Sequence, residues 1–366
     1  MIAPLGFHTG TLNIILPVGI SFYTFQTLSY TIDVFRKNIE TCDDPADFAL
    51  FVAFFPQLVA GPIVRASEFL PQLKAPRVLS WDRTLFGFRQ FVFGLVKKVF
   101  VADRVALFVD GAFTNPGGLD TVSTWLSILA WAVQVYCDFS GYSDMAIGVA
   151  RILGYDLNEN FRHPFNAINL HEHWKRWHIS LATWLRDYLY IPLGGNRKGR
   201  PRADLNMFIT MTLGGLWHGA AWTFIAWGSY NGAALAIHRW IEPIRKRFHN
   251  PGPVRKVIQG VLGWTFTQMV VLVGYVAFRA QNMDETFVIL KQMYGGSGGV
   301  SWHPPFAFIA IFIVAITHAF DGAKSLHKKT LLPHNRGYTP VLLIAALIFV
   351  YVTRTKGYTP FIYFQF

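Results

Sequence analysis

Long apolar tracts separated by short polar loops make up most of the chain. A helix needs about 20 mostly apolar residues to cross the hydrocarbon core of a bilayer, and several tracts approach that length. Glycine and proline interrupt some of them, so the pattern predicts about seven to nine spans in an all-α, polytopic integral membrane protein. The predicted spans are Leu12–Val34, Thr84–Phe108, Val122–Asp138, Leu205–His218, Ala220–Ile241, Val257–Phe278, Pro304–Phe320 and Tyr338–Thr353.

Three further segments do not suit a clean crossing. Phe48–Val64 is apolar but is cut by Pro56 and Gly61, which predicts a re-entrant or bent element. Trp174–Tyr190 has a helical pattern with several charged residues and is expected to lie in the membrane interface. Asp284–Met293 predicts a short amphipathic helix at the surface. Broken backbone is tolerated in lipid only where protein or a cavity covers it, so these helices are expected to surround a central tunnel.

The composition supports a membrane protein. Hydrophobic residues make up 52% of the chain, aromatic residues 16% and charged residues 15%, whereas a soluble chain carries roughly a quarter charged residues. The net charge of +12 is also typical of nucleic-acid-binding proteins, but the basic residues cluster between apolar tracts, as in Arg197–Arg202 and Arg245–Lys256. Both loops are therefore expected to be cytoplasmic by the positive-inside bias, and the predicted partner is membrane lipid, not nucleic acid.

The pattern predicts a single integral domain over residues 1–366, because no fixed repeat or low-complexity linker divides the chain. Cys42 and Cys137 supply neither a disulfide framework nor a set of metal ligands, and Cys137 is expected to be an inert packed thiol. Met1–Gly10 lacks the basic region of a cleaved signal. The first apolar tract is therefore expected to direct membrane insertion itself.

A polar cluster follows the third predicted span, within Gln134–Asp144. It combines hydroxyl groups, including that of Ser140, with the carboxylates of Asp138 and Asp144. Polar residues at the end of an apolar helix can bind substrate, or they can satisfy backbone groups freed by a glycine such as Gly141. A structural or supporting role is favoured, and substrate binding stays open.

The interfacial segment contains His178, two residues after Arg176. The tryptophans around it are typical of membrane–water interfaces. Further along the segment, Arg186 and Asp187 are placed to pair locally. By itself, the pattern fits His178 equally well as a hydrogen-bonded structural imidazole and as a catalytic one.

A second histidine, His218, lies between two apolar stretches in the sequence Trp217-His218-Gly219. Ionisable groups at membrane depth are costly and usually functional. Small residues on both sides allow close backbone approach and leave room for a ligand beside the ring. A neutral imidazole is suited to remove a proton from a hydroxyl group during acyl transfer. A general-base role and a structural role both remain open on the residues alone.

A metal site is the competing interpretation of the histidines. His171, His173 and His178 lie close together, and His218 could complete a set. Zinc requires three or four ligands that converge tetrahedrally. The spacing matches no known ligand pattern and no carboxylate-rich helix accompanies it, so no bound metal is predicted.

Longer motifs carry a specific resemblance. They are Leu16–Gln26, Phe54–Pro62, Tyr136–Asp144, Arg176–Ser180, Trp184–Asn196, Gly215–Gly219 and Pro360–Phe366. In this order, over nearly the whole chain, they resemble the membrane-bound O-acyltransferase (MBOAT) family. Within that family they resemble the bacterial alginate and peptidoglycan O-acetyltransferase branch.

The resemblance implies roles for individual residues. His218 would be the family's essential histidine, inside a tunnel across the membrane, where it acts as general base or orients the acyl carbonyl. His178 would be the supporting histidine near the cytoplasmic face. The remaining candidates for donor or substrate binding, or for support of the two histidines, are Trp217, Asn231, Asp138, Ser140, Asp144, Arg176, Arg186 and Asp187.

The chain departs from the family pattern in two places. Relatives often have a further histidine where this chain has Asn231, which weakens any scheme that needs a third imidazole. Relatives also carry about two to four helices before the motif at Leu16. The chain is therefore expected to be an N-terminally truncated form, with its activity in question.

The resemblance implies transfer of an acetyl group from a cytoplasmic thioester, with acetyl-CoA as donor and no bound cofactor. The acceptor would be an exported, alginate-like polysaccharide or peptidoglycan, or a periplasmic or extracellular partner acetyltransferase that completes the transfer. The location would be the bacterial inner membrane, in multi-pass form. D-alanyl transfer toward teichoic acid is the alternative within the family. A proton-coupled transporter is the alternative outside it, although paired carboxylates within spans and inverted repeats are not evident.

Overall fold

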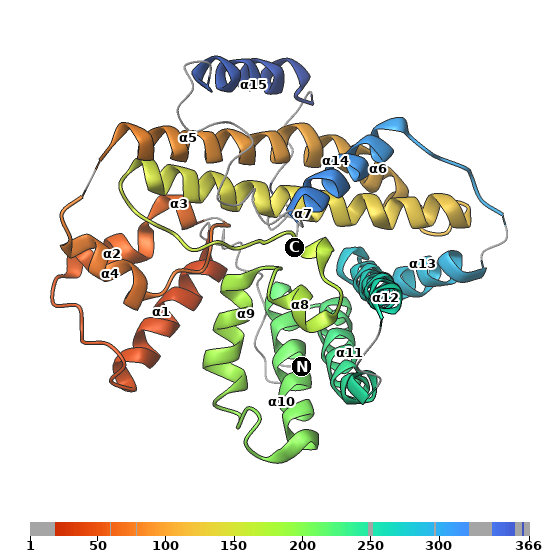
Figure 1. Ribbon diagram of the computed structural model, residues 1–366, viewed down its shortest axis with the longest axis horizontal. Helices are drawn as coiled ribbons and strands as arrows, with labels where there is room; N and C mark the ends of the chain where they lie inside the picture. The colour runs from red at the N-terminus through yellow and green to blue at the C-terminus, as the bar shows by residue number, and fades with distance from the viewer. Residues whose placement is uncertain are drawn as a thin grey trace, which may run out of the picture.

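The computed structural model of the protein describes residues 19–58, 60–77, 79–247, 252–295, 298–321, 339–355 and 361, with the backbone alone for 243–247 and 321. Within these ranges the regular structure is helical (Figure 1). The extended pairing there is one isolated bridge between Leu119 and Val300. The predicted all-α fold is confirmed.

The predicted apolar tracts are helical over most of their described residues, with Gly19, Ala220, Ala221 and Pro304 outside the helices. The corresponding elements are α1 (Ile20–Phe35), α5 (Trp81–Leu95), the π-helical segment η2 (Val96–Ala102), α6 (Asp103–Thr114), α7 (Thr121–Ile152), α10 (Gly199–His218), α11 (Trp222–Arg247), α12 (Pro253–Arg279), α14 (Pro305–Asp321) and α15 (Thr339–Thr353). Residues 12–18 of the first tract and Tyr338 of the last lie outside the described residues. The segments α5, η2 and α6 follow one another without a break, so the second tract is part of a longer helical run.

One helix of the described chain, α12, is by itself long and apolar enough to cross a membrane, with a mean hydropathy of 1.7 over an 18-residue stretch. Helices α14 and α15 are apolar but shorter. The other predicted spans carry more polar and charged residues, such as the lysines of η2. The expected seven to nine crossings therefore stay a prediction.

The interrupted segments are broken where the sequence breaks them. Helix α2 (Pro45–Ala53) is followed by the short α3 (Phe55–Leu58), with Phe54 in an extended conformation between them. Residues 60–65 then lead to α4 (Ala66–Lys74) without forming a helix or a strand. Phe48–Val64 is thus bent as predicted, and its re-entrant path stays a prediction.

The expectation of one helix over Trp174–Tyr190 is wrong in its first part. Helix α8 (Leu170–Trp174) ends before residues 175–178, and helicity resumes in α9 (Ile179–Leu185) and the π-helical η4 (Arg186–Tyr190). The interruption ends at His178, which adopts the left-handed conformation with φ 44° and ψ 55°. Few residues other than glycine adopt that conformation, so tertiary contacts must hold it.

The amphipathic segment Asp284–Met293 forms part of α13 (Met283–Gly295). Ile289 and Met293 on one side are buried, whereas Phe287 on the other side is exposed. The predicted short amphipathic helix is confirmed, and its apolar side packs against the interior.

Two long helical runs pack closely over one another. Figure 1 shows α5 alongside α7, with α15 outermost. Glycines permit the close approach, because a Cβ atom at Gly94 would overlap the carbonyl oxygen of Gly141, and one at Gly87 would overlap that of Gly148. Small residues bring helix backbones together in this way. Cys137 of α7 is buried in this core, as predicted.

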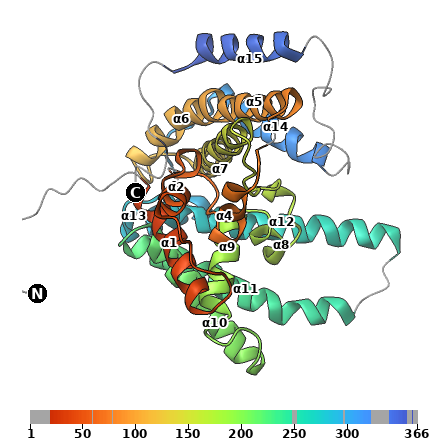
Figure 2. The same ribbon diagram turned by 90° about the vertical axis from the view of Figure 1, so that its left-hand side faces the viewer.

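Helices α10 and α11 form an antiparallel hairpin that uses the same device. A Cβ atom at Gly215 would overlap the Phe224 carbonyl oxygen, and one at Gly228 would overlap that of Met211. The predicted close approach of small residues around His218 is therefore confirmed. Figure 2 shows α11 and α12 extending together away from the α5–α7 layer. Because α10 and α11 are antiparallel, the basic start of α10 and the basic end of α11 lie at the same end of the hairpin.

This arrangement gives a test of orientation. In a variant without Cys42 and Cys137, single cysteines at Arg200 of α10 and Arg255 of α12 should resist a membrane-impermeant thiol reagent in intact cells and react after permeabilisation, because the basic loops Arg197–Arg202 and Arg245–Lys256 are predicted to be cytoplasmic. Labelling is read out on the isolated protein. Labelling of either cysteine in intact cells would contradict the predicted orientation, and with it the predicted direction of acyl transfer.

Candidate active site

His218 is the last residue of α10 and is surrounded by aromatic rings. Its ring centroid lies 5.3 Å from that of Trp227 and 5.0 Å from that of Phe278, both in edge-on geometry, and 4.8 Å from that of Trp217. Phe224 completes this group at 6.2 Å. We call the four rings the aromatic cage. It combines residues from α10, α11 and α12 around one imidazole.

Trp217 links the cage to the start of the described chain. Its ring lies 5.0 Å from Phe25 and 6.1 Å from Phe22 of α1, and Phe25 in turn packs against Trp184 of α9 at 4.1 Å with the rings tilted. The Trp184 indole N–H donates to the Phe25 carbonyl oxygen at 3.0 Å. Trp217 therefore supports the His218 side of the site by packing, and contact with a substrate stays a prediction.

His178 is buried, with 2% of its surface exposed. Its ring contacts Phe139 of α7 edge-on at 4.6 Å and lies roughly parallel to Phe161 at 6.3 Å. The Nδ1 atom lies 3.1 Å from the side-chain oxygen of Asn160. The Nε2 atom is buried and has no hydrogen-bond partner among the described residues.

Asn160 is the centre of a buried hydrogen-bond network behind His178. Its Oδ1 atom also accepts from the Ser180 backbone N–H at 3.2 Å and from the Ser180 hydroxyl at 2.9 Å. Its backbone carbonyl accepts from the Ile179 N–H at 2.9 Å. Asn160 thus holds both the ring of His178 and the start of α9, which accounts for the left-handed backbone at His178.

The fold brings the two candidate histidines into one region. His178 and His218 are close enough for the charge of one imidazole to act on the other. They lie 40 residues apart in the chain and reach this region from the start of α9 and the end of α10. The roles that the family resemblance implies for them stay predictions.

Asp138, Ser140 and Asp144 lie instead against the lysines of η2. Lys98 pairs with Asp138 at 2.5 Å, and Lys97 donates to the Ser140 hydroxyl at 2.9 Å and pairs with Asp144. These contacts hold α7 against η2. The favoured structural role for this cluster agrees with its contacts, and substrate binding by it stays a prediction.

Asp103 belongs to the same buried cluster, because Lys98 also pairs with it at 2.7 Å. The side chain of Lys98 is only 13% exposed and that of Asp138 only 4%. A buried charge is tolerated when it is paired in this way. The ion pairs of Lys98 with these two carboxylates therefore contribute strongly to the contact between η2 and α7.

The charged candidates around α9 pair near its two ends. Arg176 bonds Glu172 through two nitrogens at 3.0 and 2.9 Å. Arg186 bonds Asp187 at 2.6 Å, as predicted, and Asp187 also pairs with Arg65 at 2.6 Å. All three side chains are therefore engaged in ion pairs. A donor-binding role for these three residues stays a prediction.

Asn231 lies one helical turn beyond Trp227 on α11 and is 4% exposed. Its amide donates to the Trp227 carbonyl oxygen at 2.8 Å. It packs close to Gly274 of α12. Asn231 thus lies next to Trp227 of the aromatic cage.

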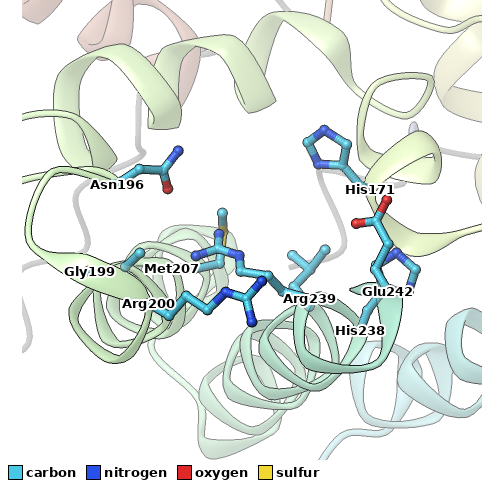
Figure 3. A pocket seen from close by; sticks show the side chains of 10 residues that line it. His171, Asn196, Gly199, Arg200, Met207, His238, Arg239 and Glu242 are labelled. Carbon is cyan, nitrogen blue, oxygen red and sulfur yellow. The ribbon is translucent and has the colours of Figure 1, made fainter. Parts of the chain in front are cut away.

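A cavity of about 530 Å³ lies at the other end of the α10–α11 hairpin. It is lined by Asn196, Gly199, Arg200, Ala203, Met207, Leu235, His171, His238, Arg239 and Glu242. Figure 3 shows the two arginines on one side of the cavity and the two histidines with Glu242 on another. Met207 precedes His218 by eleven residues on the same helix, which is roughly 16 Å along the axis.

The positive charge of this cavity comes from its arginines. Arg239 pairs with Asp204 at 3.0 Å, whereas Arg200 has no ion-pair partner among the described residues. Burial, with a smaller contribution from the charge of Lys175, lowers the pKa of His171, so that its imidazole is neutral at pH 7. Arg200 is therefore the cation best placed to receive an anionic group.

The histidines of the proposed metal set point to different places. His171 lines the cavity, His173 is buried and lies parallel to Trp177 at 6.0 Å, and His178 bonds Asn160. Among the residues that the structure describes, no three His, Cys, Asp or Glu side chains are placed to hold a metal ion.

Comparison with protein families gives the assignment. Residues 37–273 match the model of the membrane-bound O-acyltransferase family, a range that includes His178, Asn160 and His218. The chain belongs to this family. It is accordingly a membrane protein, and the resemblance of its motifs is confirmed.

Three relatives place the chain within the family. The "Probable alginate O-acetylase AlgI" of Pseudomonas putida is 39% identical over 97% of this chain and 76% of the relative. The protein of the same name from Pseudomonas aeruginosa is 45% identical over 77% of this chain and 52% of the relative. The peptidoglycan O-acetyltransferase of Helicobacter pylori is 38% identical over 80% and 59%. The chain therefore spans between about half and three quarters of these membrane-bound O-acyltransferases.

Several residues of this candidate site were not predicted from the sequence. Asn160 lies in an ordinary polar loop, and nothing in its surroundings there indicates contact with a histidine 18 residues later. Phe278 and Trp227 of the aromatic cage look like ordinary residues of apolar helices. The polar residues at the cavity could have been found from one signal, the His238 and Glu242 pair spaced one turn apart at the end of an apolar helix.

Proposed function

We propose that this chain is an O-acyltransferase that moves an acetyl group from a cytoplasmic thioester to a hydroxyl group of an exported polysaccharide. The observation that carries the proposal is the convergence of His218 and His178 in a chain whose relatives are named as O-acetylases and O-acetyltransferases. Two neighbouring imidazoles in an apolar, aromatic surrounding suit proton transfer between weak acids and bases.

The chemistry requires little beyond these groups. His218 acts as general base or orients the acyl carbonyl. As the hydroxyl oxygen bonds to the carbonyl carbon, its proton passes to an imidazole, the C–S bond breaks, and the departing thiolate takes the proton from the imidazolium. The aromatic cage supports this step because it excludes water that would otherwise hydrolyse the thioester.

The cavity at the basic end of the hairpin supports a cytoplasmic donor site. Arg200 and Arg239 offer cations to the phosphates of acetyl-CoA, while Met207 and Leu235 offer apolar surface to its arm. A donor held there by its phosphates would extend its thioester along α10 toward His218. The connecting tunnel stays a prediction, as does acetyl-CoA itself.

Arg200→Gln should raise the KM for acetyl-CoA about tenfold and change kcat little, because a charge-assisted hydrogen bond in a partly open site is lost. Arg202→Gln, two residues further along the helix and away from the cavity lining, is the matched control and should leave KM unchanged. Initial rates over a range of donor concentrations measure both. Equal KM values for the two variants would show that the donor does not bind in this cavity.

The relatives' names support the choice of acceptor, and the charge of the loops supports the location. We propose an alginate-like polysaccharide or peptidoglycan as the final acceptor, reached directly or through a periplasmic or extracellular partner acetyltransferase. A multi-pass position in the bacterial inner membrane would place the donor cavity on the cytoplasmic side and the acceptor outside. The charge of the loops supports that orientation.

The deciding experiment uses membranes that contain this chain, acetyl-CoA labelled in its acetyl group, and alginate or peptidoglycan fragments. Label should appear as an alkali-labile ester in the polysaccharide, and membranes without the chain set the background. The Pseudomonas putida relative serves as positive control. Label from a D-alanyl carrier protein instead would favour the alternative within the family, and proton flux without ester would favour the transporter.

A further inference from the structure

The buried network behind His178 fixes which way each of its hydrogen bonds runs. The backbone N–H of Ile63 donates to the Ser180 hydroxyl oxygen at 3.0 Å. The Ser180 hydroxyl in turn donates its own hydrogen to Asn160 Oδ1. The backbone N–H of Ser180 also donates to Oδ1. A backbone N–H is always a donor. Asn160 Oδ1 is therefore placed as the acceptor, and its NH₂ group is turned away.

The other side of the amide agrees with this direction. Asn160 Nδ2 donates to the Ser143 hydroxyl oxygen at 3.2 Å, and that hydroxyl is directed at the Ala60 carbonyl oxygen at 3.5 Å. Turning the amide over would set two donors against its NH₂ group. The orientation is thus set by three segments that meet here: the loop after α3, helix α7 and the start of α9.

The directions of these hydrogen bonds determine which ring nitrogen of His178 carries the hydrogen. Nδ1 of His178 faces an acceptor at 3.1 Å, so it must carry the hydrogen. In the neutral ring, Nε2 then carries a lone pair and can only accept. This nitrogen is buried in a side chain that is 2% exposed, and it has no partner among the described residues. Buried polar atoms are nearly always bonded in folded proteins, so an open one points to a reactant.

We propose that Asn160 is a positioning residue of the acyl transfer: it holds His178 with its hydrogen on Nδ1, so that Nε2 receives a hydrogen-bond-donating group, the class to which the acceptor hydroxyl belongs. This inference rests on the proposed acyltransferase function. The Nε2 atom of His178 then accepts a hydrogen bond from the acceptor hydroxyl and orients it, while His218 as general base takes up the hydroxyl proton as the oxygen attacks the thioester and returns it to the departing thiolate. The Nδ1–H bond to Asn160 stays in place throughout and keeps Nε2 free of hydrogen.

The surroundings of the ring make the assignment testable by pH. Phe139 of α7 and Phe161 of the loop before α8 flank the ring, and His218 at the end of α10 is the titratable group whose charge acts on it. A carboxylate in place of the Asn160 amide would keep an acceptor at Nδ1 and favour the charged imidazole. The acidic limb of the pH–rate profile should then move to higher pH.

The experiment compares Asn160→Ala, Asn160→Asp and Asn158→Ala in the full chain. Asn158 is the matched control, because it lies two residues away and its exposed amide bonds Glu68. Asn160→Ala should lower acetyl transfer roughly 10- to 100-fold, the usual effect of removing a group that orients a functional histidine. Asn160→Asp should recover most of that loss with the shifted pH profile, and Asn158→Ala should change neither.

An NMR measurement tests the position of the hydrogen on His178 without relying on acetyl-transfer activity. ¹⁵N NMR of histidine-labelled protein in detergent, with the His178 signals assigned from the His178→Gln spectrum, should show hydrogen on Nδ1 and a bare Nε2. Hydrogen on Nε2 in the unmodified protein would overturn the inference even if acetyl transfer is observed. The expected NMR result together with absent transfer would contradict the proposed function instead. If Asn160→Ala fails to fold, the ¹⁵N spectrum of the unmodified protein and the pH–rate profile of Asn160→Asp still test the role of Asn160.

Discussion

Replacement of His218 by alanine should reduce acetyl transfer about 10²- to 10⁴-fold, the usual worth of general-base assistance. The imidazole lies inside the aromatic cage at the end of α10, where no neighbouring ring of the cage can take a proton. Expression and membrane insertion should remain intact, because removing this ring leaves the helix backbone unchanged. Transfer of labelled acetyl groups in membranes of matched protein content measures the effect.

His303→Ala is the matched control for this prediction. His303 is an exposed imidazole before α14, and its ring contacts the Ser123 hydroxyl at 3.2 Å, away from the cage. It should leave the transfer rate unchanged. If His218→Ala protein acetylates at the unmodified rate, both the role inferred from the family and the proton-transfer argument fail.

Replacement of Lys98 by methionine should lower the free energy of unfolding by about 3–5 kcal/mol, the usual effect of removing one partner from a buried ion pair. Lys98 is the shared cation of Asp138 and Asp103, at 2.5 and 2.7 Å. Without it, two carboxylates between η2 and α7 lose their common counter-charge. Unfolding titrations of the purified protein in detergent measure the change.

The double variant Lys98→Met, Asp138→Leu should recover part of this loss, because a carboxylate is removed together with its cation. Lys291→Met, at an exposed lysine of α13, is the control and should alter stability by less than about 0.5 kcal/mol. An effect of Lys98→Met no larger than that of the control would show that the cluster contributes little to stability.

The sequence by itself determined the class of protein and the positions of its long apolar helices. Tracts such as Val257–Phe278 are helical because a continuous apolar stretch in lipid must satisfy its backbone hydrogen bonds internally, and the structure has a helix there. The glycines near His218 indicated close backbone contact before any neighbour was known. His218 itself stood out because an ionisable group in an apolar tract is costly.

Other features could be assigned only from the tertiary structure. The helical pattern of Trp174–Tyr190 gave no sign of the break at His178, because the left-handed backbone there is held by Asn160 from a separate loop. Asp138 and Asp144 looked equally suited to substrate and to support until the lysines of η2 were placed beside them.

The same limit applies to the two histidines. Local sequence determines periodicity, turn chemistry and the cost of a buried charge, and these act over a few residues. The aromatic cage, the hydrogen on Nδ1 of His178 and the pairing of Lys98 depend on groups from distant segments. A side chain's hydrogen-bond direction and its charge partners are set by whichever atoms the packed fold brings within about 3 Å, and that packing decided the site.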